Sequence, residues 1–155
     1  MMKELSPHER QIVDQAVGIL EARMLHPGAM LSTLSVISSY LMLKLSDYEQ
    51  QVFGCIFLDS KQRIVEDAVL FKGTLNICPA YPRVIVQEAL KRPAVNVIVY
   101  RNDLEWEMDA YSIPLNIGPE ARKVHAALGL IDVKLMDYIV VSGTHTRSLE
   151  ALGVF

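Results

Sequence analysis

The order of strand-forming and helix-forming segments after residue 50 constrains the fold more than any other feature of this sequence. A run dense in strand formers spans 52–58, and a polar turn separates it from a second run over 64–71. This pattern predicts an antiparallel hairpin. Apolar residues at helical spacing over 83–91 then precede the apolar run 95–99, which is typical of a strand covered on both faces. Strands alternating with a helix indicate the α/β class.

The N-terminal segment, about 6–45, predicts two helices. Ser6-Pro7-His8-Glu9 has a serine N-cap, proline at the first helical position and glutamate at the third, which is the pattern of a capping box. Apolar residues continue at helical spacing to Met24, and His26-Pro27-Gly28 ends the helix. A second helix is predicted from residue 32 or 33 to about 46.

The C-terminal third predicts one helix and two strands. Pro119 opens a helix that Leu128-Gly129 closes, and two final strands are predicted over 131–135 and 138–141, followed by a tail over 148–155. The stretch 101–118 has no clear period, and loops of that length in a compact domain are usually functional or disordered. We therefore look for a site there.

Length and composition predict one intracellular domain. The 155 residues suffice for a single core over 1–155, and the formal net charge of −3, without a basic run, argues against a nucleic-acid partner. Cys55 and Cys78 lie in unrelated apolar contexts, so we expect core thiols in a reducing compartment. The N-terminus has no signal peptide and no apolar run is long enough for a bilayer, so we expect a cytoplasmic protein without a membrane partner.

Four segments together resemble the RadC-like branch of the JAB/MPN domains, in its short form without a helix-hairpin-helix. They are VFGCIFLD from Val52, LFKGTL from Leu70, YPRVIVQEAL from Tyr81 and ALGLIDVKLMDYIVVSG from Ala127. The resemblance covers nearly the whole chain. It implies a three-layer, cytidine-deaminase-like fold, in which helices flank a mixed β-sheet.

The metal motif of that family is degenerate in this chain. Members that keep it have a glutamate before the Leu-Phe-x-Gly-Thr segment, a His-x-His-Pro after the central strand, and then a serine and an aspartate, and these groups bind zinc and activate its water. The resemblance places Ala68 at the glutamate and Arg101 and Asp103 at the histidines, with Leu104 replacing the proline. The serine and aspartate fall between 112 and 117 in an uncertain register. We expect no metal, no cofactor and, on balance, no enzyme.

Arg101 brings its own positive charge to the position of the lost ion. A guanidinium has no lone pair to give to a metal. We expect Arg101 to pair with Asp103, Asp109 or Asp137 as a salt-bridged plug. Acidic residues alternate with apolar ones after it, which predicts a ribbon that binds a partner protein through Arg101, Asn102, Asp103, Glu105, Trp106 and Glu107.

Three functions stay open from the sequence. The leading hypothesis is an inactive, protein-binding JAB/MPN-like module, as a homo-oligomer or with another partner, and its resemblance to short RadC-like proteins implies an accessory or counter-defence role in a mobile element. The second is a metal-dependent, isopeptidase-like hydrolase with rearranged carboxylates, from Glu66, Asp103, Glu105, Glu107 or Asp109. The third is a DNA-repair-associated binding protein. His8, His26, His125 and His145 are too scattered to form a recognisable ligand set.

Overall fold

Five strands and four α-helices form a mixed α/β fold in the computed structural model, which describes residues 4–30, 33–75, 77–104, 113, 116–143 and 145–155. The helices are α1 (Pro7–Leu20), continued by a π-helical turn (Glu21–Leu25), α2 (Leu34–Leu45), α3 (Pro82–Leu90) and α4 (Ile117–Gly129). The strands are β1 (Val52–Leu58), β2 (Ile64–Lys72), β3 (Asn96–Asn102), β4 (Lys134–Ser142) and β5 (His145–Ser148). In the described part of the chain, no helix combines the length and apolar character needed to cross a bilayer.

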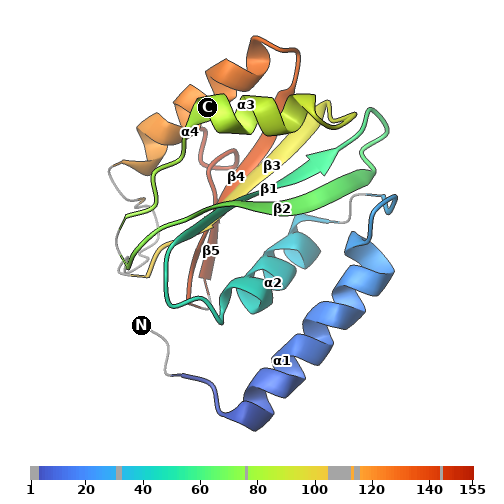
Figure 1. Ribbon diagram of the computed structural model, residues 1–155, viewed down its shortest axis with the longest axis vertical. Helices are drawn as coiled ribbons and strands as arrows, with labels where there is room; N and C mark the ends of the chain where they lie inside the picture. The colour runs from blue at the N-terminus through green and yellow to red at the C-terminus, as the bar shows by residue number, and fades with distance from the viewer. Residues whose placement is uncertain (1–3, 31–32, 76, 105–112, 114–115, 144) are drawn as a thin grey trace.

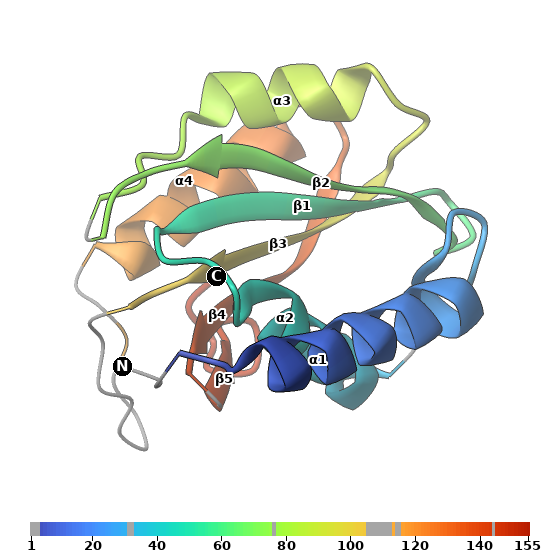
Figure 2. The same cartoon turned by 60° about the horizontal axis from the view of Figure 1, so that its bottom comes forward.

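The sheet has the order β2-β1-β3-β4-β5, in which only β3 and β4 pair in parallel. Helices α3 and α4 cover one face, and α1 and α2 lie on the other (Figures 1 and 2). The α/β class with a mixed sheet flanked by helices is therefore confirmed.

Each face of the sheet has its own hydrophobic core, because successive side chains of a strand point to opposite faces. On the α3/α4 face, Phe53, Cys55 and Phe57 of β1 pack with helix residues such as Ile85 and Leu128. The opposite core joins β1 and β3 to α2 and is formed by Leu25, Ile37, Tyr40, Leu41, Leu45, Val52, Ile56, Leu58, Ile64, Ile98, Tyr100, Ile139 and Val141. All seven residues of β1 are buried, so this strand is the centre of both cores.

Three element predictions are corrected by the structure. Arg101 and Asn102 belong to β3 rather than to a loop, because Arg101 pairs with Phe53 of β1 and Asn102 with Val141 of β4. The two final predicted strands are one strand, β4. Its pairing with β3 has an irregular register near Asp137, at the point where the sequence pattern predicts a break. The last strand, β5, was not predicted and lies mostly before the predicted tail. Its residues are polar, so they lack the apolar alternation that predicts a strand.

The capping box predicted for the first helix is confirmed. The Glu9 backbone amide donates to the Ser6 hydroxyl at 3.2 Å, and the Ser6 amide donates to the Glu9 carboxylate at 2.8 Å. These bonds satisfy two of the amides that a helix start leaves without partners.

Gly54 makes room for the ring of Tyr100. A Cβ atom added at Gly54 would lie 2.3 Å from Cζ of Tyr100, a separation that real structures do not show. Since Tyr100 is fully buried, its ring has no free space to move into. Glycine at this point of β1 is therefore required by packing.

We expect Gly54→Ala to lower the free energy of unfolding by about 3 kcal/mol, because it overpacks a closed core. Gly18→Ala makes the same chemical change in α1, where nothing lies within 4 Å of the added atom. This control should raise stability by up to about 1 kcal/mol, because alanine favours helices. Urea unfolding followed by circular dichroism measures both. Equal stabilities for the two variants would contradict this view of Gly54.

Candidate functional site

Arg101 forms a buried ion pair on the α3/α4 side of the sheet. Its side chain is 3% exposed, and its Nη1 donates to the two carboxylate oxygens of Glu120 at 2.9 and 3.1 Å. Nη2 donates to Oε1 of Gln51 at 3.0 Å. The pair therefore joins β3, the first turn of α4 and the segment that enters β1.

The Gly-Thr pair of the Leu-Phe-Lys-Gly-Thr segment holds Gln51 in place. The Gly73 amide donates to the Gln51 carbonyl, and the Gln51 amide donates to the Thr74 carbonyl, each at 2.8 Å. A Cβ atom at Gly73 would lie 1.8 Å from the Ile77 carbonyl oxygen, so only glycine fits there. This motif thus positions the amide side chain that contacts Arg101.

Tyr138 completes the network from β4. Its hydroxyl donates to Oε1 of Glu120, and its ring is fully buried. Burial, and then the charge of Glu120, raise the pKa of the Tyr138 phenol far above its ordinary value, so the phenol remains a donor. Burial by itself lowers the pKa of Arg101, but the neighbouring Tyr138 and Glu120 raise it by more, so this pKa lies above its ordinary value. The guanidinium therefore stays charged in this buried site.

These residues do not fit the zinc ion that the JAB/MPN resemblance implies. The position of the first histidine holds a guanidinium, which donates hydrogen bonds and has no lone pair for a metal. Glu120, the carboxylate beside it, already accepts from Arg101 and Tyr138. A second positive charge next to Arg101 would also be repelled.

The structure gives Arg101 a partner that was not among the three predicted ones. Among the described residues its ion pair is with Glu120, and not with Asp103 or Asp137. Asp137 instead accepts hydrogen bonds from the Tyr138 amide and the Ser148 hydroxyl, both at 2.7 Å. The third predicted partner, Asp109, lies outside the described residues.

The other predicted site residues are spread over the sheet. Ala68 of β2 is half-buried against the core on the α3/α4 face, and its neighbour across β1 is Val99. Asn102 is buried, and its side chain accepts from the Val52 amide and donates to the Gln50 carbonyl, so it serves the interior of the domain. Asp103 is half-buried and follows β3 directly. Glu105, Trp106 and Glu107 lie outside the described residues.

Glu66 does not join Arg101. Its carboxylate forms an ion pair with Arg92, whose guanidinium also binds Glu88 at 2.8 Å. Cys55 and Cys78 are buried free thiols, as predicted. In the described parts of the chain, no group of three or more His, Cys, Asp or Glu side chains has an arrangement suited to a metal.

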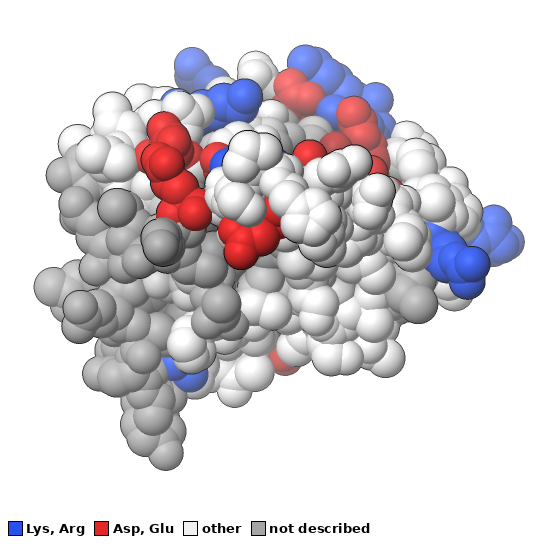
Figure 3. All heavy atoms as spheres, turned by 90° about the horizontal axis from the view of Figure 1, so that it is seen from below, with Lys and Arg blue, Asp and Glu red and all other residues white. Residues whose placement is uncertain are grey.

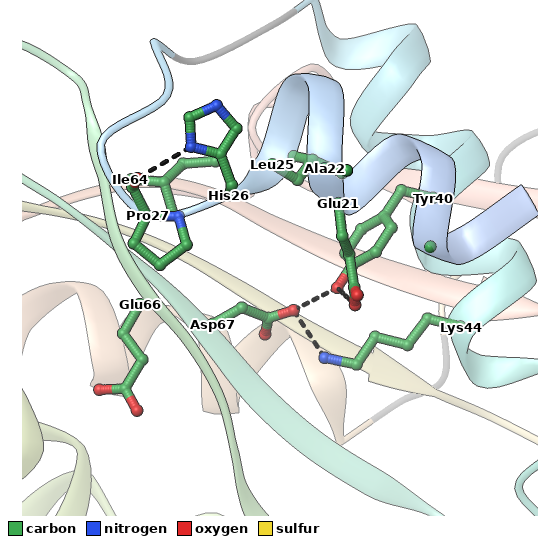
Figure 4. A pocket seen from close by; sticks show the side chains of 11 residues that line it. Glu21, Ala22, Leu25, His26, Pro27, Tyr40, Lys44, Ile64, Glu66 and Asp67 are labelled. Atoms are coloured by element: carbon green, nitrogen blue, oxygen red, sulfur yellow. Dashed lines mark hydrogen bonds and ion pairs between the residues drawn. The ribbon is translucent and has the colours of Figure 1, made fainter.

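A second polar network, which sequence reasoning missed, lies on the opposite face of β3. Asp67 of β2 accepts from the Tyr100 hydroxyl at 2.6 Å, from Lys44 Nζ at 2.6 Å and from the Tyr40 hydroxyl at 2.7 Å. Lys44 Nζ also donates to the Tyr100 hydroxyl at 3.0 Å. Figure 4 shows Tyr40, Lys44 and Asp67 converging beside the helix that carries Glu21. The signal in the sequence was a tyrosine and a lysine one helical turn apart in a helix with no other charged residue.

Sequence reasoning also missed Gln51, Glu120 and Tyr138. Glu120 lies 19 residues from Arg101 along the chain, and only the fold brings the two together. Its acidic position in the first turn of the predicted helix after Pro119 was the available signal, because carboxylates favour that end of a helix. Such a signal indicates a helix start and not a partner for a distant arginine.

Comparison with known proteins identifies the family. The model of the RadC-like JAB domain matches residues 31–154. A UPF0758 protein of Cupriavidus pinatubonensis is 38% identical over 143 residues, which are 90% of this chain and 61% of that protein. A UPF0758 protein of Vibrio cholerae is 31% identical over 92% of this chain and 88% of its own length. UPF0758 protein YeeS of Escherichia coli is 24% identical over 97% of this chain and 99% of its own length.

The chain thus spans less than two thirds of the Cupriavidus protein, so what that longer protein does is not carried over to it. The match to the family model nevertheless covers strands β1 to β4 and helices α3 and α4 in full. It also covers the short strand β5 and α2 in full, whereas α1 and its π-helical turn precede the matched residues. The resemblance seen in the four sequence segments is confirmed, and the chain belongs to the RadC-like JAB domain family.

Proposed function

We propose that this RadC-like JAB domain binds a protein partner and does not hydrolyse a bond. The observation that carries the proposal is the buried Arg101–Glu120 pair at the position where the family resemblance expects a zinc ligand. A guanidinium at that position cannot activate water as a zinc ion does. We therefore infer that the domain recognises a partner protein and that the Arg101–Glu120 pair stabilises the fold that does so.

The segment that follows β3 is the proposed contact with the partner. Glu105, Trp106 and Glu107 belong to it, and the support for this role is the alternation of acidic and apolar residues in the sequence. Arg101 and Asn102 anchor the strand from which the segment leaves, through bonds to Glu120, Gln51 and the Val52 amide. In this proposal the buried residues position the segment and the segment makes the contact.

The surface gives little support to the alternative of DNA binding. The formal net charge is −3, and the described part of the face seen from below is largely uncharged, without a continuous basic stripe (Figure 3). Proteins that bind DNA through its phosphates need such a surface. We also propose a cytoplasmic location, which two buried free thiols support. An accessory role in a mobile element stays a prediction.

Metal content tests the absence of zinc chemistry. After incubation with zinc and dialysis, we expect the purified full chain to retain far less than one zinc ion per molecule. The variant Ala68→Glu/Arg101→His/Asp103→His should retain more, because imidazole nitrogens and carboxylate oxygens are donors that zinc prefers. Mass spectrometry of the metal content makes the measurement.

The control for this experiment is Ala68→Gln/Arg101→Gln/Asp103→Asn, which removes the same side chains without adding an imidazole. It should retain as little zinc as the natural chain. One tightly held zinc ion per natural chain would reject the proposal and favour the alternative of a hydrolase with rearranged carboxylates.

Loss of the Arg101 guanidinium should destabilise the domain. We expect Arg101→Met to lower the free energy of unfolding by about 3 kcal/mol, because it leaves the Glu120 carboxylate without its buried partner. The double variant Arg101→Met/Glu120→Leu should recover part of that loss. Lys91→Met breaks the exposed pair with Glu88 and should change stability by at most about 0.5 kcal/mol. Equal losses for Arg101→Met and Lys91→Met in urea unfolding would argue against the plug.

Trp106→Ala tests the proposed contact segment. We expect affinity capture from the native host to lose one specific protein with this variant, because aromatic residues dominate interface energies. Tyr81→Ala is the matched control, since Tyr81 is an exposed aromatic residue on the loop before α3. The captured protein, once identified and purified, should bind the natural chain directly in calorimetry and bind Trp106→Ala much more weakly. Capture that both variants leave unchanged would refute the role of this segment.

A further inference from the structure

A pocket of about 480 Å³ opens on the face of the sheet opposite to Arg101. The end of α1 and its π-helical turn form one wall, α2 forms the second and the start of β2 the third (Figure 4). Its lining combines aliphatic surface from Leu25, Pro27 and Ile64 with the polar groups of Glu21, Tyr40, Lys44 and Asp67. Glu66 also lines the pocket, but its carboxylate pairs with Arg92 and points away from Asp67.

Two carboxylates at this pocket share the hydroxyl of Tyr40. The Tyr40 hydroxyl lies 2.7 Å from Oδ2 of Asp67 and 3.2 Å from Oε1 of Glu21, but a phenol has one proton to donate. Burial, and then the charge of Asp67, raise the pKa of the Tyr40 phenol far above its ordinary value, so that this single proton is retained. The shorter distance gives the proton to Asp67. Glu21 is left at the pocket wall with a shared donor.

The two carboxylates differ in their charge partners. Lys44 neutralises Asp67 at 2.6 Å, and no ion pair to Glu21 exists among the described residues. One negative charge therefore remains on the pocket wall. The Asp67 oxygens, in contrast, accept three hydrogen bonds in total.

The pocket already holds one ammonium group in an aromatic setting. Lys44 Nζ lies 5.2 Å from the ring centre of Tyr100 and 5.7 Å from that of Tyr40, distances at which a cation interacts with the ring face. This internal cation binds Asp67, while Glu21 lines the same pocket and is exposed to solvent. The chemistry of the walls thus suits an ammonium group with an aliphatic stem.

We propose that this pocket binds an alkylammonium group, with its nitrogen donating to the Glu21 carboxylate and its methylene stem lying against Leu25, Pro27 and Ile64. Such a group supplies the N–H donors and the positive charge that Glu21 lacks. The stem removes aliphatic surface from water on both sides. A lysine side chain of a protein and a free aliphatic diamine both carry this chemistry. The site is separate from the Arg101 network and does not depend on the function proposed above.

Titration of the ¹⁵N-labelled full chain tests the site by NMR. The probes are Nα-acetyl-lysine methylamide, cadaverine and, as a neutral control, 1-pentanol. Both amines should shift the backbone amides of Glu21, Ala22, Lys44 and Ile64 in a saturable manner, and the alcohol should not. Tighter binding of the lysine derivative identifies a protein side chain as the ligand, and tighter binding of cadaverine identifies a free diamine.

Glu21→Gln provides the decisive variant, because it keeps the shape of the side chain and removes its charge. We expect it to weaken amine binding about tenfold, as for the loss of a charge-assisted hydrogen bond. Glu49→Gln makes the same change at an exposed position outside the pocket and should leave binding unchanged. Unchanged binding to Glu21→Gln, or shifts spread over acidic residues elsewhere, would overturn the proposal. The zinc measurements on Arg101 variants do not bear on this outcome.

Discussion

Burial of β3 on both faces is the constraint on which the rest of this structure depends. A strand between two cores cannot send a polar side chain to solvent, so each polar residue on it needs partners inside the domain. Tyr100 and Arg101 are consecutive residues with 0% and 2% exposure, and they point to opposite faces. Each of these two side chains therefore contacts polar groups from segments that are distant in the sequence.

The two networks meet that demand in different ways. Arg101 brings charge into the interior, and Glu120, Gln51 and Tyr138 arrive from three other segments to surround it. Its Nε has no hydrogen-bond partner among the described residues, so the arrangement is close to satisfied but not complete. The Tyr100 hydroxyl donates to Asp67, which also accepts from Lys44 and Tyr40. These three partners line a pocket that is open to solvent. The first network is closed by the fold, and the second reaches the surface.

Sequence patterns predicted what depends on local chemistry and on period. The capping box fixed the start of α1, the hairpin of β1 and β2 followed from two apolar runs and a polar turn, and four short segments identified the family. The site was less predictable, because its partners come from far along the chain. The sequence places Arg101 in a loop because the apolar run ends before it, but pairing with β1 on one side and β4 on the other extends the strand through it. Nothing near Asp137 in the sequence distinguishes an irregular strand from two short ones.

A guanidinium and a metal ion are unequal occupants of one position, even though both are positive. A zinc ion draws several donors to a point and leaves one site open for water, whereas Arg101 spreads its charge over a plane and directs each N–H at a separate acceptor. Its Nη1 binds Glu120 and its Nη2 binds Gln51, so the two acceptors lie at different points around the guanidinium. In the function proposed above, Arg101 is therefore a cross-link at the position where the family resemblance expects a zinc ligand. On the Tyr100 side, in contrast, the polar groups of Asp67, Lys44 and Tyr40 lie at a pocket that opens to solvent.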